Sequence, residues 1–361
     1  MRKEMFCSKS VTALCIYHSA DMDGRASAAM IYRAFGAYCE GYNYNRPVDV
    51  PLYLRRFPNL EKVYVVDYSL EENEIMNFLN SGISIVWCDH HETAIKKFAK
   101  MEIGRDFDID IFYKNIPHSF EIYHYHYSHY IDSGKSVSFE AHVSLHYSGC
   151  ELTYLYLADS DPSSFVSTCN DVYNIPYRTD GFIRVPNFII YFLGRYDVWD
   201  RSIREEEWNM ALDLQMFFRN EETWPNSPIF DKVFNDSNDF FKEGIKKGSI
   251  LRKYQDKVNA TCIKSWGFTI KWEGVSFLAM NGVGNSLLAE SAFDPDLHDA
   301  ILYFIFDPKN CKWRFSLFHS SKSNPDLDLS AIALKYGGGG HRGACGFSLD
   351  RIPFDLNDAK K

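Results

Sequence analysis

One apolar run that ends abruptly in an acid and two histidines constrains this chain more than any other feature. The run is Ile83-Ser84-Ile85-Val86-Trp87-Cys88, and Asp89, His90 and His91 follow it directly. A short, largely β-branched and aromatic run of this kind is typical of a buried strand. The sequence therefore predicts a strand that delivers polar side chains at its C-terminal edge.

The same pattern occurs twice upstream, in apolar runs that begin at Leu14 and Val63, and residues 185–193 form a further apolar segment that closes on an acid. Because the carboxyl ends of parallel strands meet at one edge of a sheet, side chains that follow such runs are expected to converge in a crevice there. The converging residues are expected to be His18, Asp21, Asp23, Asp67, Asp89, His90, His91 and Asp197.

This set combines carboxylates with imidazoles and contains no thiolate, which favours Mn²⁺ or Mg²⁺ over a closed structural zinc site. So many acids in one crevice would repel one another unless cations neutralised them. Two divalent ions about 3.5–4 Å apart would do so, and such a pair suits in-line displacement at phosphorus by an activated water. Each of these segment ends has an ordinary explanation when taken alone, since an Asp-x-Asp pair before glycine is often a turn or a helix N-cap. Four apolar segments of one domain that all end in such side chains are harder to explain in that way.

A run of four glycines near the C-terminus is the second feature that points to a phosphate ligand. Glycines can serve simply as a flexible turn, but they also allow close backbone approach and leave amide groups for an anion. Basic side chains follow this run directly. The predicted phosphate-binding residues are Gly338, Gly339, Gly340, His341, Arg342 and Arg314, with His319, Ser320 and Ser321 as weaker candidates.

The order of patterns predicts an α/β protein with about two domains, as expected for 361 residues. Strands alternate with helices up to about residue 98, which indicates a parallel sheet. The predicted parts are a metal-binding catalytic domain over residues 1–230, a helical connector over 231–260 and a smaller α+β substrate-binding domain over 261–361.

Residues 103–146 break the alternation of strands and helices. They contain a segment in which aromatic and polar residues alternate, Tyr123-His124-Tyr125-His126-Tyr127-Ser128-His129-Tyr130. Such alternation is typical of a hairpin strand with one exposed face. Its histidines could form a second metal site. An ordinary half-buried strand is the favoured interpretation, because the segment has no acid or cysteine at ligand spacing.

Charge and cysteine usage restrict the partners and the compartment. The formal net charge of −9 argues against long duplex nucleic acid, whose binding depends on many Lys and Arg contacts. Nine cysteines occur without a CxxC pair, which favours a reducing, cytoplasmic compartment. No signal-peptide pattern and no membrane-spanning apolar run is expected, and the sequence is compatible with a homo-oligomer.

These motifs, in this order, resemble the DHH phosphoesterase superfamily in its DHH plus DHHA1 arrangement. The resemblance is carried by Asp21-x-Asp23-Gly24, Asp67, Asp89-His90-His91, Asp197 and the Gly-Gly-Gly-His at 338–341. Within the superfamily, HSADMDG, SGCELTYLYL and the GRYDVW stretch are most similar to the RecJ-like, nanoRNase B-type oligoribonuclease branch.

The resemblance implies a two-domain, exonuclease-like phosphodiesterase with Mn²⁺ bound by the first domain and its active site in the cleft between the domains. It implies that Asp67 bridges two ions, that His91 lies beside the scissile phosphate, and that Asp89 orients the imidazoles. It assigns His18 and Asp21 to one ion, and Asp23, His90 and Asp197 to the other. Phe318 and His319 stand where many relatives have an Arg-Ser pair, so phosphate contacts are expected to fall to Arg314 and Arg342.

The function predicted first is hydrolysis of short oligonucleotides to nucleoside monophosphates by a metal-activated water. Cleavage of a cyclic mono- or dinucleotide uses the same chemistry and is a second hypothesis. A hypothesis from another class is a non-catalytic nucleotide sensor, which would bind nucleotide without turnover. Aromatic side chains that stack on bases would serve any of these functions.

Overall fold

The computed structural model describes residues 10–43, 46–110, 112, 122–132, 134–160, 187–235, 237–285 and 287–359. The chain forms two compact units, Met1–Leu251 and Arg252–Lys361. The boundary falls within the long helix α10 (Ser237–Trp266). None of the helices in the described ranges has the length and apolar character needed to cross a bilayer.

A six-stranded sheet organises the first unit, in the order β2-β1-β3-β4-β6-β5. Neighbouring strands pair in parallel from β2 to β6, and β5 joins the edge as the antiparallel partner of β6. The predicted parallel sheet is therefore present, and the hairpin from the interrupting segment extends it. The strands are β1 (Ala13–His18), β2 (Tyr38–Tyr42), β3 (Lys62–Val66), β4 (Ser84–Asp89), β5 (Tyr123–Tyr130) and β6 (Ser136–Val143).

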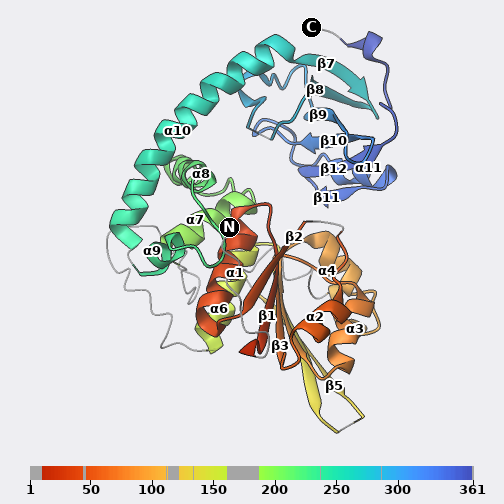
Figure 1. The fold of residues 1–361 in the computed structure, drawn as a ribbon. Coiled ribbons are helices and arrows are strands. Elements are labelled where there is room, and N and C mark those ends of the chain that lie inside the picture. Colours follow the sequence, from red (N-terminus) through yellow and green to blue (C-terminus); the bar gives the residue numbers. More distant parts are fainter. Residues whose placement is uncertain are drawn as a thin grey trace. The chain divides into compact units, whose positions relative to one another are not determined.

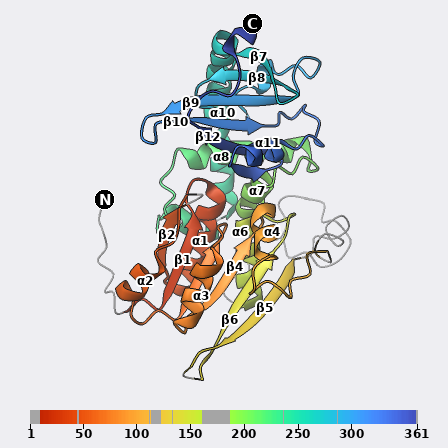
Figure 2. The same cartoon turned by 90° about the vertical axis from the view of Figure 1, so that its right-hand side faces the viewer.

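Helices cover both faces of this sheet (Figures 1 and 2). Alternate strand residues bury against the two layers: Tyr64 and Val66 belong to the core under α1 and α6, while Val63 and Val65 belong to the core under α2, α3 and α4. Burial on both faces explains why β1, β3 and β4 have continuous apolar sequences. The helices are α1 (Met22–Phe35), α2 (Val50–Arg56), α3 (Glu72–Asn80), α4 (Glu92–Phe98), α6 (Gly149–Ser160), α7 (Phe188–Asp197), α8 (Glu205–Arg219) and α9 (Ile229–Asn235).

The apolar segment before Asp197 differs from the strand-end pattern that the sequence indicated. Its described part is helix α7, which begins after the N-cap Asn187 and ends at Asp197, whereas residues 185 and 186 lie outside the described ranges. The helix is buried among α6, α8 and α10, as its many apolar residues in the same core show. A short segment that is apolar on nearly all sides has no periodicity that separates a buried helix from a buried strand.

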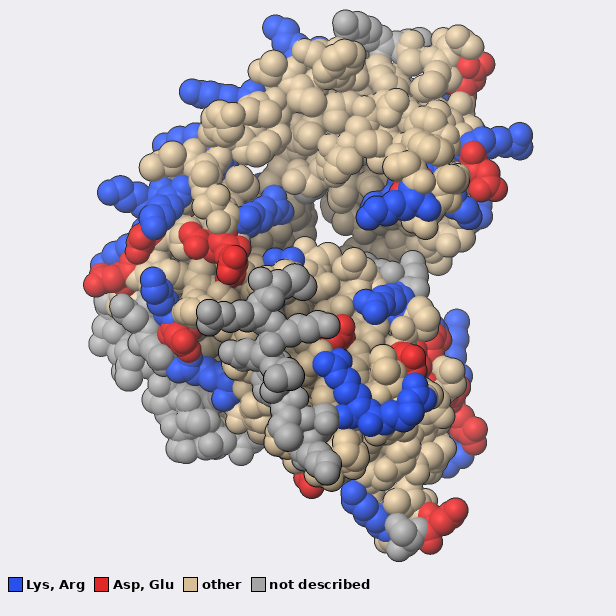
Figure 3. Space-filling view, in the orientation of Figure 1, with Lys and Arg blue, Asp and Glu red and all other residues tan. Residues whose placement is uncertain are grey.

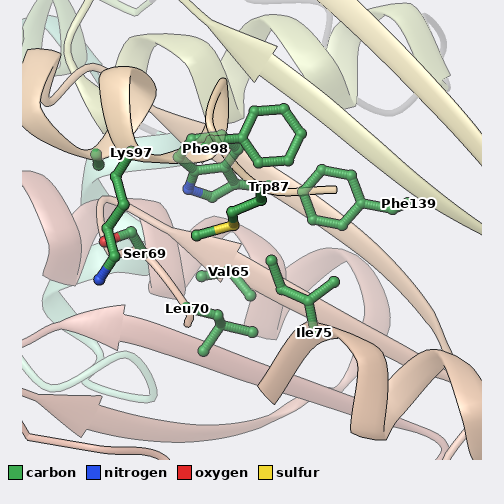
Figure 4. A pocket seen from close by; sticks show the side chains of 10 residues that line it. Val65, Ser69, Leu70, Ile75, Trp87, Lys97, Phe98 and Phe139 are labelled. Atoms are coloured by element: carbon green, nitrogen blue, oxygen red, sulfur yellow. The ribbon is translucent and has the colours of Figure 1, made fainter. Parts of the chain in front are cut away.

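A small apolar pocket lies between the sheet and helices α3 and α4 (Figure 4). Trp87, Phe98 and Phe139 contribute its aromatic lining, and Ser69 and Lys97 are the polar residues among those that line it. None of the predicted metal-binding residues lines this pocket. This pocket is therefore separate from the polar side chains that were predicted at the ends of the strands.

The second unit is a six-stranded mixed sheet in the order β11-β12-β10-β9-β8-β7, in which only the β8–β9 pair is parallel. One face packs against α11 (Leu329–Lys335) around Phe315 and Phe347, and the other packs around Leu278 and Tyr303. The strands are β7 (Phe268–Trp272), β8 (Val275–Asn281), β9 (Ala300–Asp307), β10 (Lys312–Phe318), β11 (Gly339–His341) and β12 (Ala344–Leu349), and the short helices are η2 (Glu290–Ala292) and η3 (Leu356–Asp358). The α+β architecture predicted for this part of the chain is confirmed.

Basic and acidic side chains are interspersed over the described part of the face shown in Figure 3. Lys and Arg side chains stand out along α10, where Lys246, Lys253 and Lys257 are exposed. The mixture of both signs of charge on this face fits the overall acidic charge of the chain.

Candidate metal centre

Three neighbouring parallel strands bring the predicted side chains to one edge of the first sheet. His18 is the last residue of β1, Asp67 follows β3 directly, and Asp89 is the last residue of β4. Asp21 caps the N-terminus of α1 and Asp23 lies in its first turn. Asp197 reaches the same place from the last residue of α7.

The side chains form three overlapping groups in which the potential ligand atoms lie within 4.8 Å of one another. Asp67 belongs to two of these groups and so does His90. The overlap means that one compact cluster could hold more than one ion. The groups are Asp67 with His90 and His91, His18 with Asp21 and Asp67, and Asp23 with His90 and Asp197.

Carboxylates converge on single imidazole nitrogens in this cluster. His90 Nε2 lies 3.1 Å from Asp197 Oδ2, 3.2 Å from Asp67 Oδ1 and 3.6 Å from Asp23 Oδ2. One N–H can donate well to one of these oxygens, so the other carboxylates need a different source of positive charge. Donors of this kind around a common centre fit a divalent cation.

The pKa values of the clustered side chains are shifted by burial and by the close approach of their charges. Burial raises the pKa of the Asp23 carboxyl well above its usual value, and repulsion from Asp67 and Asp197 adds to this. Burial alone would also raise the pKa of Asp67, but His18 and His90 hold it below its usual range. Although burial favours a neutral imidazole, Asp21 and Asp67 raise the pKa of His18 to about 10. Protonated imidazoles thus neutralise the acids here, and bound cations would take over that role.

Asp23 is held by the N-terminus of helix α6. The backbone N–H groups of Gly149 and Cys150 donate to its two carboxylate oxygens, at 2.7 and 2.8 Å. Helix N-termini favour negative charge because their first amides lack partners within the helix. This contact fixes a buried side chain of the cluster. Its one signal in the sequence was a glycine at the start of an apolar segment.

Asp89 is occupied by hydrogen bonds that orient its neighbours. Its Oδ1 accepts from the backbone amides of His90 and His91 and lies 2.7 Å from His91 Nδ1. Trp87 Nε1 lies 3.2 Å from its Oδ2. This geometry suits a group that holds the His91 ring in place, with His91 Nδ1 3.7 Å from Asp67 Oδ1.

A buried ion pair lies directly behind the cluster. Arg195, two residues before Asp197 on α7, contacts Glu151 of α6 through Nε at 3.2 Å and through Nη2, and Nη1 lies 3.0 Å from Asp200. Although burial would lower the pKa of Arg195, Glu151 raises it above its usual value. The pair joins the helix that holds Asp23 to the helix that carries Asp197. The sequence signal for it was a single arginine just after the apolar segment 185–193.

The predicted phosphate-binding residues lie in the second unit. Gly338, Gly339 and Gly340 lead into and form β11, and a Cβ at Gly338 would lie 2.0 Å from the carbonyl oxygen of Gly346. Close packing therefore requires a glycine there whether or not phosphate binds. His341, Arg342 and Arg314 are exposed, and Arg342 donates to the backbone carbonyl of Asp326.

The weaker phosphate candidates have structural partners. His319 Nε2 lies 2.9 Å from the carbonyl oxygen of Leu327, and Ser320 is buried. Ser321 donates to Glu290. The roles of the second unit in phosphate binding remain a prediction.

Replacing Gly149 by alanine is expected to disturb the cluster. A Cβ at this position would lie 2.6 Å from Asp67 Cβ and 2.9 Å from Asp23 Oδ2. Because neither neighbour can move without displacing a side chain of the cluster, we expect Mn²⁺ affinity, measured by isothermal titration calorimetry, to fall at least tenfold, on the order seen when partners of metal ligands are lost. Gly339→Ala is the folding control, since a Cβ there would have nothing within 4 Å. An unchanged affinity in Gly149→Ala would contradict the tight packing of α6 against the cluster.

Sequence comparisons give a relative of this chain but no family. No family model matches the chain. The sequence is 24% identical to an uncharacterised protein, R106, of Acanthamoeba polyphaga mimivirus. The alignment is 382 positions long and covers 99% of this chain and 73% of that protein.

Among solved structures, the chain is similar to a DHH-domain protein described as a member of the s1p family of ribosomal proteins. The TM-score is 0.53 and the identity 12%, over 93% of this chain and 82% of that chain. A weaker likeness, with a TM-score of 0.39 and 10% identity over 94% and 93% of the two chains, is to a pGpG-specific phosphodiesterase of Vibrio cholerae. The chain therefore shares its fold with a DHH-domain protein, as the resemblance in sequence predicted.

Proposed function

We propose that this chain is a metal-dependent hydrolase that cleaves phosphodiester bonds in short oligonucleotides and releases nucleoside monophosphates. The observation that carries the proposal is the convergence of four aspartates and three histidines in three overlapping groups at the ends of β1, β3 and β4. The DHH-type fold and the motif order in the sequence support the same chemistry.

Each group of the cluster has a role in this proposal. His18, Asp21 and Asp67 would hold one divalent ion, and Asp23, His90 and Asp197 would hold a second, with Asp67 serving both. Such ions, Mn²⁺ or Mg²⁺ by the chemistry of the donors, would supply an activated water and would neutralise the charge of the phosphate.

Other residues position the reaction without holding an ion. Asp89 orients the His91 imidazole, and that imidazole contacts a phosphate oxygen of the substrate. Arg314, His341 and Arg342, which are exposed in the second unit, bind further substrate phosphates.

The test is release of mononucleotide from an end-labelled RNA dinucleotide in the presence of Mn²⁺. We expect turnover by the unaltered protein and weaker substrate binding in His341→Ala. We expect a loss of about 10- to 100-fold in Asp89→Asn, because the amide keeps one acceptor oxygen but loses the negative charge beside His91 and the second acceptor for Trp87. Parallel reactions with longer RNA, DNA and a cyclic dinucleotide define the substrate. Nucleotide binding without turnover would favour a sensor and contradict the proposal.

A further inference from the structure

The edge hairpin β5–β6 gathers metal-type side chains on one face, away from the strand ends that carry the cluster. Residues two apart on a strand point to the same face, so His124 and His126 of β5 lie side by side. The antiparallel register sets His142 of β6 opposite His124, and Glu140 opposite His126. Four potential donors thus occupy neighbouring positions on one face of the hairpin, and two of them come from β6, outside residues 123–130.

Two of these donors already meet. His124 Nδ1 and His142 Nδ1 are 2.8 Å apart, and the two rings lie edge to face with centroids 4.8 Å apart. One nitrogen of such a contact must be deprotonated. Two nitrogens aimed at each other from opposite strands are close to the separation of about 3.3 Å that two imidazoles have on a tetrahedral ion with bonds of about 2.0–2.1 Å.

The other two donors are available at the same face. His126 Nε2 lies 3.2 Å from Ser128 Oγ, and Glu140 Oε1 accepts from Ser138 Oγ at 3.0 Å. On a partly exposed sheet face, water can replace His126 and Glu140 as the hydrogen-bond partners of these serine hydroxyls. Cross-strand neighbours have Cβ atoms about 4.5–5.5 Å apart, so rotation about side-chain bonds brings a third donor to the His124–His142 pair.

We propose that His124, His142 and Glu140, with His126 as a fourth donor, form a second metal site that takes a late first-row divalent ion such as Zn²⁺, Ni²⁺ or Cu²⁺. Imidazole-rich donor sets prefer these ions, whereas the carboxylate-rich cluster at the strand ends suits Mn²⁺ or Mg²⁺. The ion replaces the direct nitrogen-to-nitrogen contact and ties the edge strand β5 to β6. The site does not depend on the activity proposed above.

The experiment measures Ni²⁺ bound per full-length chain by equilibrium dialysis and elemental analysis, with excess Mn²⁺ present to occupy the first cluster. We expect the unaltered protein to bind one Ni²⁺ more than His142→Ala, and His124→Ala to weaken this binding at least tenfold. The matched control is His129→Ala, because His129 lies on the same strand but alternates to the other face and contacts Asn80.

A second readout identifies the ligands directly. With Cu²⁺ at one equivalent, the electron paramagnetic resonance spectrum should show coupling to imidazole nitrogens that is lost in His142→Ala and kept in His129→Ala. Equal Ni²⁺ content in the unaltered, His124→Ala and His142→Ala proteins, each folded by circular dichroism, would overturn the proposal. An equal loss in His129→Ala would overturn it as well.

Discussion

Replacing Asp67 by asparagine is expected to abolish Mn²⁺ binding and to lower dinucleotide hydrolysis on the order of a thousandfold. Asp67 groups with His18 and Asp21 of the first proposed ion site, and its Oδ1 lies 3.2 Å from Nε2 of His90 in the second, so its loss is expected to weaken both sites. Removing metal-derived stabilisation of several kcal/mol corresponds to about this factor, at about 1.4 kcal/mol for each tenfold change.

Asparagine is preferred to alanine as the replacement because Asp67 has a φ of 52°. Asparagine tolerates this left-handed conformation better than alanine does, so the backbone after β3 should be preserved. The measurements are metal content by elemental analysis, turnover of the labelled dinucleotide, and circular dichroism to establish folding.

The matched control is Asp231→Asn, which removes an exposed carboxylate paired with Arg33 on the surface. We expect this variant to keep full metal content and turnover, because surface ion pairs contribute little. Two Mn²⁺ ions per chain in Asp67→Asn, equal to the unaltered protein, would show that Asp67 does not bridge the ions.

The strand ends of the cluster could be predicted because the signal is local. His18, Asp67 and Asp89 each end an apolar run, and parallel pairing of β1, β3 and β4 then brings them to one edge. The α+β character of the second unit, expected over residues 261–361, was likewise visible as local periodicity.

What the sequence did not reveal depends on contacts between distant segments. The amides of Gly149 and Cys150 bond Asp23 across more than a hundred residues of chain, and Glu151 meets Arg195 across two helices. His142 and Glu140 face the histidines of β5 only because of the strand register. Such pairs have no periodic pattern, so a single sequence cannot identify them.

Replacing Glu151 by glutamine is expected to lower the free energy of unfolding by about 3–5 kcal/mol. Both members of the Glu151–Arg195 pair are buried, with exposed fractions of 1% and 4%. Replacing Glu151 leaves the buried charge of Arg195 with Asp200 as its remaining carboxylate partner among the described residues, and this incomplete compensation is the source of the cost. The measurement is urea denaturation, with Glu243→Gln as the matched control, because Glu243 pairs with Lys247 on the exposed side of α10 and should change stability little.

The same variant tests whether the pair positions the cluster or only stabilises the fold. Because Arg195 is two residues from Asp197 and Glu151 is next to the amides that hold Asp23, we expect Glu151→Gln to weaken Mn²⁺ binding as well. Replacing both partners by methionine should restore much of the unfolding free energy, since a neutral pair carries no uncompensated charge. Mn²⁺ affinity should stay reduced in that double variant, because the link between α6 and α7 is still missing. If affinity instead recovers together with stability, the ion pair supports the fold alone, and the placement of Asp197 must come from the packing of α7 against α8.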